Sequence, residues 1–230
     1  MSLTDSNILY EDNHVIAVNK LCGQLVQGDN TGDIPLSELL KEYLKIKYQK
    51  PGNVFAGVTH RLDRPVSGVV LFAKTSKALT RLNKMFHDKE IKKTYWALTN
   101  TPPPHTAKTL IHNLLRDTEK NKSFVSKKSN SNTKEAILDY KLLSNSNTFY
   151  LLEILLHTGR HHQIRTQLAH IGCPIIGDLK YGYPNPNKDK GICLHAHKID
   201  FIHPVKQIPV KIIAPPPKEM HWQIFEKLST

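Results

Sequence analysis

Four strand-like segments follow one another between residues 92 and 157, with no helical pattern between them. They comprise residues 92–100, 108–115, 134–143 and 149–157, and each is rich in β-branched and aromatic residues. Loops rather than helices connect them, and parallel neighbours would need long crossovers. This order predicts an antiparallel sheet.

The segments before and after this block show both helical and strand periodicity. Helices are predicted at residues 35–48, 76–89 and 159–172, with a terminal helix at 215–228 that packs Trp222, Phe225 and Leu228. Strands are expected at residues 8–20 (a pair around a turn), 54–59, 68–74, 192–202 and 209–214. The Lys-, Ser- and Asn-rich residues 116–135 are predicted to form a mobile loop facing solvent.

The charge balance indicates a polyanionic partner. The chain has 32 Lys and Arg against 20 Asp and Glu, a net charge of +12. Nucleic acid or an acidic membrane would fit this excess, although surplus Lys can also serve solubility. With 39% hydrophobic and 23% charged residues, the composition is that of a folded protein and excludes disordered and collagen-like classes.

The cysteines and the N-terminal segment bear on the compartment. Cys22, Cys173 and Cys193 form an odd set without paired spacing, which fits a reducing cytosol rather than a disulfide framework. No targeting segment or long apolar run is evident. A soluble, cytoplasmic protein without a membrane partner is therefore expected.

Asp63 is the first residue that could carry chemistry. It lies between Arg61 and Arg64 in a polar loop that joins two apolar strands. Two neighbouring guanidinium groups favour its ionised form, so it would be a persistent carboxylate. An Asx turn or a loop salt bridge would explain the same pattern.

Arg165 and Tyr95 are two further candidates. Arg165 lies at the edge of the apolar stripe of its predicted helix, so we expect a half-buried guanidinium. Such a group needs a carboxylate or phosphate, which a distant loop could supply, unless it snorkels to water. Strand alternation sends Tyr95 to the face opposite Trp96, where it faces either a site or the core.

Metal binding is disfavoured by the sequence. Cys193, His195 and His197 alternate along a predicted strand and could hold zinc together. No fourth ligand is evident, and an ordinary strand face explains the pattern as well. No P-loop or dinucleotide fingerprint occurs, which is consistent with a chain that needs no nucleotide or redox cofactor.

Four ordered segments together resemble one known family. HRLDRPVSGVVLFAKT resembles the catalytic-loop motif of the RluA-type pseudouridine synthases. KKTYWALT resembles the second motif of that family, HTGRHHQIRTQLAHIGCPIIGDLKYG its third, and LHAHKIDFIHP its strand near the C-terminus. The match spans roughly residues 7–214.

The resemblance implies a fold and an activity. The fold would be α+β, with a mixed, largely antiparallel central sheet flanked by helices and an active-site cleft across the middle of the sheet. The chain would form a single catalytic domain over residues 1–230, with subdomains of about 1–105 and 106–230 as the alternative division. The activity would be the isomerisation of uridine in RNA to pseudouridine, without a cofactor.

The resemblance also implies roles for individual residues. Asp63 would be the catalytic aspartate, Arg165 the arginine paired with it, and Tyr95 the aromatic that stacks on uracil and helps remove the proton from carbon 5. Arg61 and Leu62 would help to open the RNA and hold the flipped nucleotide, and Arg160 and His162 are further RNA-contact candidates. Sequence reasoning leaves open whether Asp63 attacks the sugar or acts as a base.

Two departures and two rival functions accompany this interpretation. The family more often has Thr where Val66 stands and His where Gln167 stands, which bears on loop hydrogen bonding and substrate positioning. An RNA-binding or ribosome-assembly factor without catalysis would explain the charge equally well. A metal-dependent hydrolase that uses the histidines is the second rival.

The expected partner is a short stem-loop in tRNA or ribosomal RNA. The first strand of the resemblance begins near Ile8, so no accessory RNA-binding module is expected before it. A monomer is expected.

Overall fold

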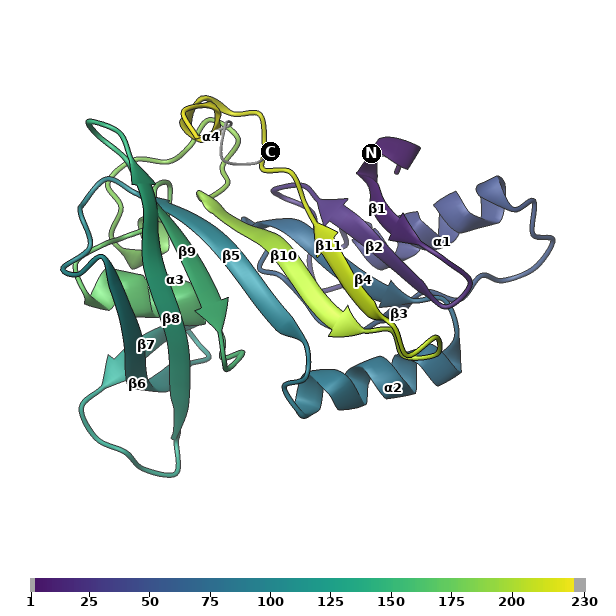
Figure 1. Cartoon of the computed structure of the whole chain (residues 1–230), viewed down its shortest axis with the longest axis horizontal. Helices are drawn as coiled ribbons and strands as arrows, with labels where there is room; N and C mark the ends of the chain where they lie inside the picture. The colour runs from purple at the N-terminus through teal and green to yellow at the C-terminus, as the bar shows by residue number, and fades with distance from the viewer. Residues whose placement is uncertain (1–2, 226–230) are drawn as a thin grey trace. The chain divides into compact units, whose positions relative to one another are not determined.

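The computed structural model describes residues 3–225 and divides the chain into two compact units. Unit 1 comprises residues 3–91 and 196–215, and unit 2 comprises residues 92–195 and 216–225. Each unit is therefore built from two separate stretches of chain. Figure 1 shows the elements of both units in chain order.

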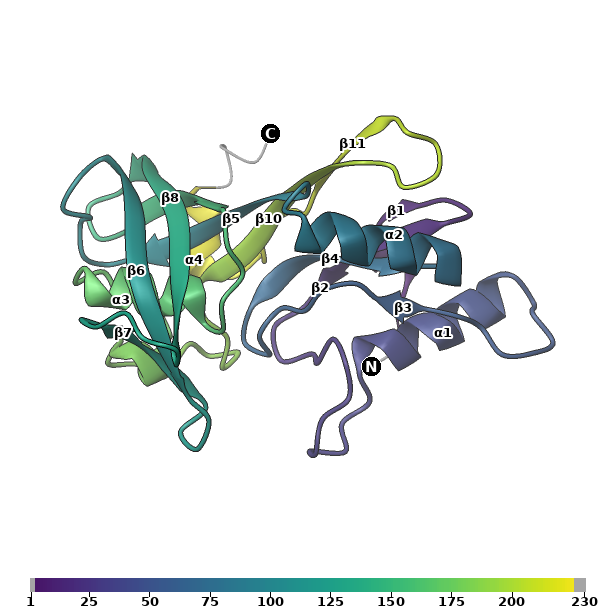
Figure 2. The same cartoon turned by 90° about the horizontal axis from the view of Figure 1, so that it is seen from below.

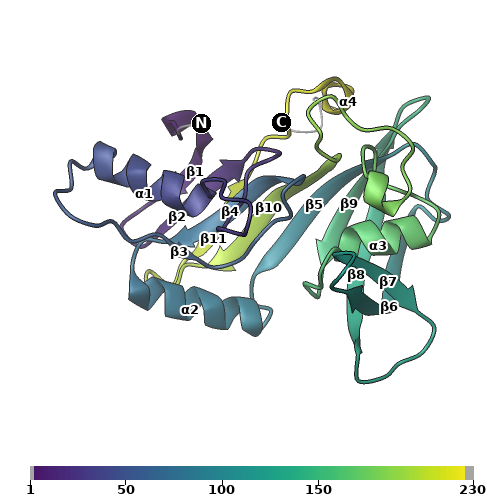
Figure 3. The ribbon, with the colours of Figure 1, turned by 180° about the vertical axis from the view of Figure 1, so that it is seen from behind.

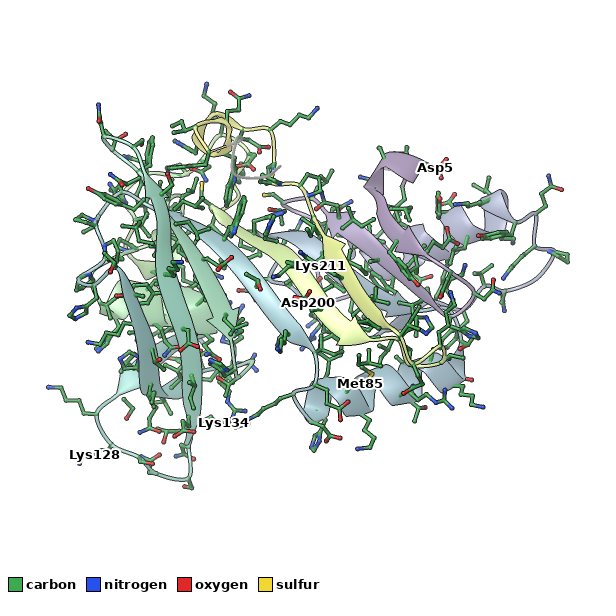
Figure 4. The ribbon with its side chains drawn as sticks, in the orientation of Figure 1. Asp5, Met85, Lys128, Lys134, Asp200 and Lys211 are labelled. Atoms are coloured by element: carbon green, nitrogen blue, oxygen red, sulfur yellow. The ribbon has the colours of Figure 1, made fainter. Side chains whose placement is uncertain are left out.

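Unit 1 contains a sheet in the order β1–β2–β4–β10. Its strands are β1 (Ile8–Glu11), β2 (Val15–Lys20), β4 (Ser67–Ala73) and β10 (Leu194–Ile202), the last of which belongs to unit 1 from Ala196 onward. β11 (Pro209–Ile213) pairs with β10, and the two-residue β3 (Gly57–Val58) pairs with β4. Asp200 and Lys211 face each other across β10 and β11, as Figure 4 shows.

Two helices of unit 1 cover one face of this sheet, which is the face seen in Figure 3. α1 (Leu36–Lys47) buries Leu36, Leu39, Leu40 and Leu44, so its apolar stripe faces the core as its periodicity predicts. α2 (Ser76–His87) begins after Thr75, whose hydroxyl accepts the N–H of Ala78. Both helices confirm the sequence prediction.

Unit 2 contains five antiparallel strands in the order β5–β9–β8–β6–β7. They are β5 (Lys92–Thr99), β6 (Ala107–Asp117), β7 (Lys122–Ser126), β8 (Thr133–Asn145) and β9 (Tyr150–Leu156). The helix α3 (Gln163–His170) lies over the β6–β8 region in Figure 3, and the short α4 (Met220–Gln223) follows β11 in the chain. The antiparallel order predicted from the sequence is confirmed.

Several predicted elements need correction. The expected loop at 116–135 contains β7, which pairs with β6 and buries Ser123. The exposed Lys128 and Lys134 lie in the connection from β7 to β8 and at the start of β8 (Figure 4). The strand expected at 54–59 shortens to Gly57–Val58, and the terminal helix to Met220–Gln223. Leu228 lies outside the described residues.

Short 3-10 helices complete the described elements. Asp5–Asn7 precedes β1, and Leu179–Tyr181, called η2, follows α3. Neither was predicted from the sequence. Within residues 3–225, no helix is both long and apolar enough to span a membrane.

Candidate active site

The Asp63 loop joins β3 to β4 in unit 1. Asp63 is half-buried, and its carbonyl oxygen accepts the N–H of Val66 at 3.0 Å, which closes a turn directly before β4. Arg61 is exposed and Leu62 is buried. The loop therefore contains an exposed arginine, a buried leucine and a half-buried carboxylate in succession, and the roles that the resemblance implies for them stay predictions.

The start of this loop is anchored by His60. Its Nε2 accepts the backbone N–H of Leu71 at 3.0 Å, and its ring packs against Phe86 at 4.7 Å between centroids. Leu71 belongs to β4 and Phe86 to α2. The chain just before Arg61 is thus fixed to both the sheet and the helix.

Lys20, at the end of β2, holds the other end of the loop. Its side chain is fully buried, and its ammonium donates to the carbonyl oxygens of Leu21 (3.1 Å), Arg64 (3.1 Å) and Val66 (2.6 Å). An ammonium has three donors, and three carbonyls receive them. The main chain on both sides of Pro65 is therefore tied to one buried cation.

Burial lowers the pKa of Lys20 to about 8, although the nearby Cys22 and Asp63 favour the protonated form. Sequence reasoning missed this residue. The available signal was a lysine that ends an apolar strand at a position paired with Gly68 of the next strand.

Gly68 lets the loop enter the sheet beside another backbone. Its φ is +116°, and a Cβ at this position would lie 2.4 Å from the carbonyl oxygen of Ala196 in β10. A side chain cannot fit against backbone atoms at that distance. The glycine after Ser67 therefore allows the close approach of β4 and β10 just beyond the loop.

Arg64 contacts two residues that precede the loop in the sequence. Its guanidinium forms an ion pair with Asp33 at 2.6 Å, and its Nε donates to the carbonyl oxygen of Gly23 at 3.1 Å. We expected both flanking arginines to favour an ionised Asp63. Arg64 forms its ion pair with Asp33, both side chains are about half exposed, and its influence on Asp63 stays a prediction.

In unit 2, Arg165 lies on α3 and is only 5% exposed, so it is more buried than its helical position predicts. Its Nε donates to one carboxylate oxygen of Asp178 at 2.7 Å and its Nη2 to the other at 2.8 Å. Asp178 is 1% exposed and immediately precedes η2. The predicted need for a carboxylate is met within the unit by this bidentate pair.

Tyr181 completes the surroundings of the arginine. The guanidinium carbon of Arg165 lies 5.0 Å from the centroid of the Tyr181 ring, a cation–π distance. Because η2 separates Asp178 from Tyr181 by one turn, one short helix supplies both partners. Sequence reasoning gave neither residue a role, although both lie in the quoted segment GDLKYG.

The Tyr181 hydroxyl connects η2 to β7 and to the start of α3. It accepts the backbone N–H of Ser123 at 2.8 Å and lies 2.9 Å from Nδ1 of His162. Burial raises the pKa of Tyr181, so the phenol remains protonated at neutral pH. The hydroxyl thereby fixes the β7 strand against the arginine site.

His162 marks a change of direction before α3. Its φ is +51°, in the left-handed region, so the helix begins at Gln163 rather than near Gly159 as predicted. The ring of His162 stacks on that of His161 with 3.8 Å between centroids. His161 in turn lies 2.9 Å from the Ser123 hydroxyl through Nδ1.

Arg160 is exposed at the entrance to the same turn. Its Nε donates to the carbonyl oxygen of Glu135 at 2.8 Å, and its backbone N–H donates to Oε1 of Gln163 at 3.0 Å. The Gln163 amide group also donates to the carbonyl oxygen of Ile137. These bonds hold Arg160 beside β8.

Gln167 replaces the histidine that is more frequent in the family, and it joins α3 to the sheet. Its fully buried amide nitrogen lies within 3.2 Å of the carbonyl oxygens of Leu110 and Ala136 and 3.0 Å from Nδ1 of His112. This departure therefore has a structural explanation: the amide connects the helix to β6 and β8.

Tyr95 lies on β5, opposite Ile154 of β9. It is 8% exposed and Trp96 is 4% exposed, so both faces of the strand are covered here. Arg165 and Tyr95 belong to unit 2 and Asp63 to unit 1. The pairing of Asp63 with Arg165 and the stacking role of Tyr95 stay predictions.

The histidines near β10 have partners other than a metal. Nδ1 of His197 lies 3.1 Å from the carbonyl oxygen of Ala214, and the His195 ring packs edge-on against Trp222. Among residues 3–225 no group of three or more His, Cys, Asp or Glu has a geometry that could hold a metal ion.

Comparison with known proteins identifies the class. The family model described as RNA pseudouridylate synthase matches residues 14–170, a segment that includes Asp63, Tyr95 and Arg165. The solved structure of Human RNA Pseudouridylate Synthase Domain Containing 4 superposes with a TM-score of 0.78 at 22% identity, covering 97% of this chain and 91% of that one. Human RNA Pseudouridylate Synthase Domain Containing 1 gives 0.72 at 20% identity, covering 100% and 98%. The fold is that of this class.

Sequence relatives place the chain more closely. Ribosomal large subunit pseudouridine synthase C of Buchnera aphidicola subsp. Baizongia pistaciae is 35% identical over 219 residues, 90% of this chain and 66% of the relative. Ribosomal large subunit pseudouridine synthase D of Xylella fastidiosa is 33% identical over 229 residues, 93% and 67%. The chain thus spans about two thirds of the length of these curated relatives.

The chain belongs to the RNA pseudouridylate synthase family. This confirms the predicted family, the RluA-type pseudouridine synthases, and the predicted enzyme class, an RNA pseudouridine synthase. It also confirms the predicted α+β fold with a mixed, largely antiparallel sheet.

Proposed function

We propose that this protein isomerises uridine to pseudouridine in ribosomal RNA of the large subunit. One observation carries the proposal: the matched family segment contains Asp63, Tyr95 and Arg165 together. The names of the curated relatives support ribosomal RNA over tRNA. We also propose a cytoplasmic location, because ribosomes that work in the cytoplasm would supply such a substrate.

The reaction begins with Asp63. The bond between ribose and uracil nitrogen must break beside an ionised carboxylate, which acts on the sugar as nucleophile or base. The turn closed by Val66 and the three carbonyls held by Lys20 fix the backbone on which this carboxylate stands. The backbone that carries the carboxylate is therefore held in one conformation.

The detached uracil then needs charge stabilisation and a surface on which to turn. Arg165 supplies a fixed cation whose orientation is set by Asp178 and Tyr181. Tyr95 supplies an aromatic face. The target nucleotide must leave its stack, at a cost of a few kcal/mol that Arg61, Leu62, Arg160 and His162 help to recover through RNA contacts.

Tritium release from RNA labelled at uracil carbon 5 tests the proposal. Asp63→Asn should lower the release from a transcript of large-subunit ribosomal RNA by at least about 10³-fold. Asp29→Asn, an exposed carboxylate change in the same unit, is the matched control and should keep full turnover. RNA affinity of the Asp63 variant should remain near that of the wild type.

Other outcomes would contradict parts of the proposal. Retained release in Asp63→Asn would remove Asp63 from catalysis. A wild-type protein that binds the transcript but releases no tritium would favour a non-catalytic RNA-binding factor. Release from tRNA alone would overturn the assignment to ribosomal RNA.

A further inference from the structure

A basic hollow lies in unit 1 where three segments meet. Its volume is about 430 Å³, and it is lined by His14 from the β1–β2 turn, by Thr75, Lys77 and Arg81 from the start of α2, and by Val205 from the β10–β11 turn. These segments lie side by side in Figures 1 and 2. The hollow takes no part in the site described above.

Two cations of the hollow have no acidic partner among residues 3–225. Lys77 and Arg81 lie four residues apart on α2 and so project from the same side of the helix. Arg81 donates through Nη1 to the carbonyl oxygen of Pro204 at 2.7 Å, which fixes its guanidinium but leaves other N–H groups to donate. Neither residue forms an ion pair with any acid in the described part of the chain.

Asp12, an acid close to the hollow, is neutralised by its own neighbours. Its Oδ1 accepts the backbone N–H groups of His14 and Val15, and its Oδ2 accepts Tyr10 and lies 2.9 Å from the Lys206 ammonium. Burial opposes ionisation, yet these bonds hold the pKa of Asp12 well below its usual range. This carboxylate therefore does not offset Lys77 or Arg81.

Glu11 is occupied in the same way. It pairs with Lys74 at 2.6 Å and with Lys47 at 2.9 Å, and it also accepts the Tyr48 hydroxyl. Burial would raise its pKa, but these bonds lower it to about 2. The hollow thus keeps a net positive charge in a region that also contains two acids.

The hollow and the Asp63 loop lie at opposite ends of one strand. Asp63 precedes β4 and Thr75 follows it, and β4 has seven residues. A strand of that length spans about 20 Å. A phosphate bound at the hollow would therefore be separated from a nucleotide at Asp63 by about the length of this strand.

We propose that this hollow is a second contact site for RNA, which takes a backbone phosphate through Lys77 and Arg81 about 20 Å or more from the target uridine. Phosphate oxygens are the acceptors that a fixed guanidinium and a flexible ammonium bind together. The site contributes affinity and orientation, and it takes no part in the chemistry. The proposal rests on the proposed RNA substrate.

Salt-dependent RNA binding by Lys77→Gln and Arg81→Gln tests the proposal. Two probes are used, a short stem-loop that carries the target uridine and the same stem-loop extended by a duplex arm. Each variant should weaken binding of the extended RNA by about 3–10-fold and reduce the slope of log K against log salt by about 1, with little effect on the short RNA. Lys45→Gln, an exposed charge change on α1, is the matched control.

Two further measurements and one comparison of the binding data complete the test. Tritium release from the short stem-loop should be unchanged in both variants. If the wild type itself releases no tritium, the proposed function is contradicted, whereas the binding comparison still tests the second contact site. Equal losses in Lys77→Gln and Lys45→Gln would overturn the second contact site. Inorganic phosphate that shifts the His14 NMR signals as strongly as the extended RNA would identify a free-anion site instead.

Discussion

Asp63 and Arg165 are positioned by different kinds of contact. In the Asp63 loop, the buried Lys20 donates hydrogen bonds to three main-chain carbonyl oxygens. The turn itself is closed by the hydrogen bond from the N–H of Val66 to the carbonyl oxygen of Asp63. Around Arg165, a carboxylate and a phenol contact the guanidinium directly. Beyond its anchors Lys20 and His60, the loop should therefore tolerate changes in its exposed side chains. The orientation of Arg165 should instead depend on Asp178 and Tyr181.

The largest effect is expected at Asp178. Asp178→Asn leaves a buried guanidinium facing an amide group, so the free energy of unfolding should fall by about 3–5 kcal/mol in urea denaturation. The matched control is Asp200→Asn, because that carboxylate is partly exposed and 3.6 Å from Lys198. Its effect should stay below about 1 kcal/mol.

A double variant separates stability from function at this pair. Arg165→Met with Asp178→Leu removes both buried charges and should recover most of the lost stability. Tritium release should nevertheless remain lost, because the cation is gone. An Asp178→Asn protein as stable as the wild type would show that the pair does not hold the arginine.

Lys20→Met should have the next largest effect, through the main chain. Three carbonyl oxygens lose their donor, and the free energy of unfolding at pH 7 should fall by about 2–4 kcal/mol. Turnover should also fall, because the backbone on both sides of Pro65 is released. Unchanged turnover in a folded variant would mean that this lysine does not position the loop.

The pH dependence of the same variant gives an independent measurement. Burial lowers the pKa of Lys20 to about 8 in the folded protein, whereas the pKa of a lysine in the unfolded chain is about 10.4. Between these two pH values the unfolded state binds more protons than the folded state. As the pH rises through this window, the free energy of unfolding of the wild type should therefore increase relative to that of Lys20→Met by on the order of 1–3 kcal/mol. Lys45→Met, which alters an exposed lysine, should show no such trend, and a constant difference from pH 7 to 10 would contradict the burial effect.

Tyr181→Phe should have a smaller effect, because it keeps the ring beside Arg165 and removes only the hydroxyl. The buried N–H of Ser123 loses its acceptor, at an expected cost of about 1–2 kcal/mol. Hydrogen exchange at Ser123 should accelerate with it. Tyr183→Phe is the control, and equal exchange rates in the two variants would show that the hydroxyl does not hold β7.

The smallest effect is expected at Arg64. Arg64→Gln breaks an exposed ion pair with Asp33 and should change the free energy of unfolding by less than about 1 kcal/mol. The hydrogen bonds from Lys20 use the backbone of residue 64, which the substitution keeps. A loss as large as that of Lys20→Met would contradict the view that the main chain holds this loop.

Local patterns in the sequence predicted most elements of the fold. Helical spacing of leucines located α1, because that helix buries a regular face. A high content of β-branched and aromatic residues located β5 and β9, which are largely buried strands. β7 was missed because Lys122–Ser126 reads as polar. Its strand state depends on pairing with β6 and on the contact of Ser123 with Tyr181, which no local pattern displays.

The candidate site was predicted only in part, because contacts between segments distant in the sequence also determine it. The position of Arg165 on its helix indicated that a carboxylate was needed, but it did not indicate which one. Asp178 becomes the partner only after η2 turns back toward α3. Lys20 carries a charge that normally marks an exposed position, and its burial follows from a loop far along the chain.

The division of each unit into two stretches has a consequence for synthesis on the ribosome. β4 cannot pair with β10 until residues 92–195 have been made, a delay of roughly 5–20 s. During that time β3 covers only Phe72 and Ala73 on this edge of β4, so the rest of the edge is open. Such edges promote association between chains. The nascent protein should therefore depend on chaperones until β10 has left the ribosome.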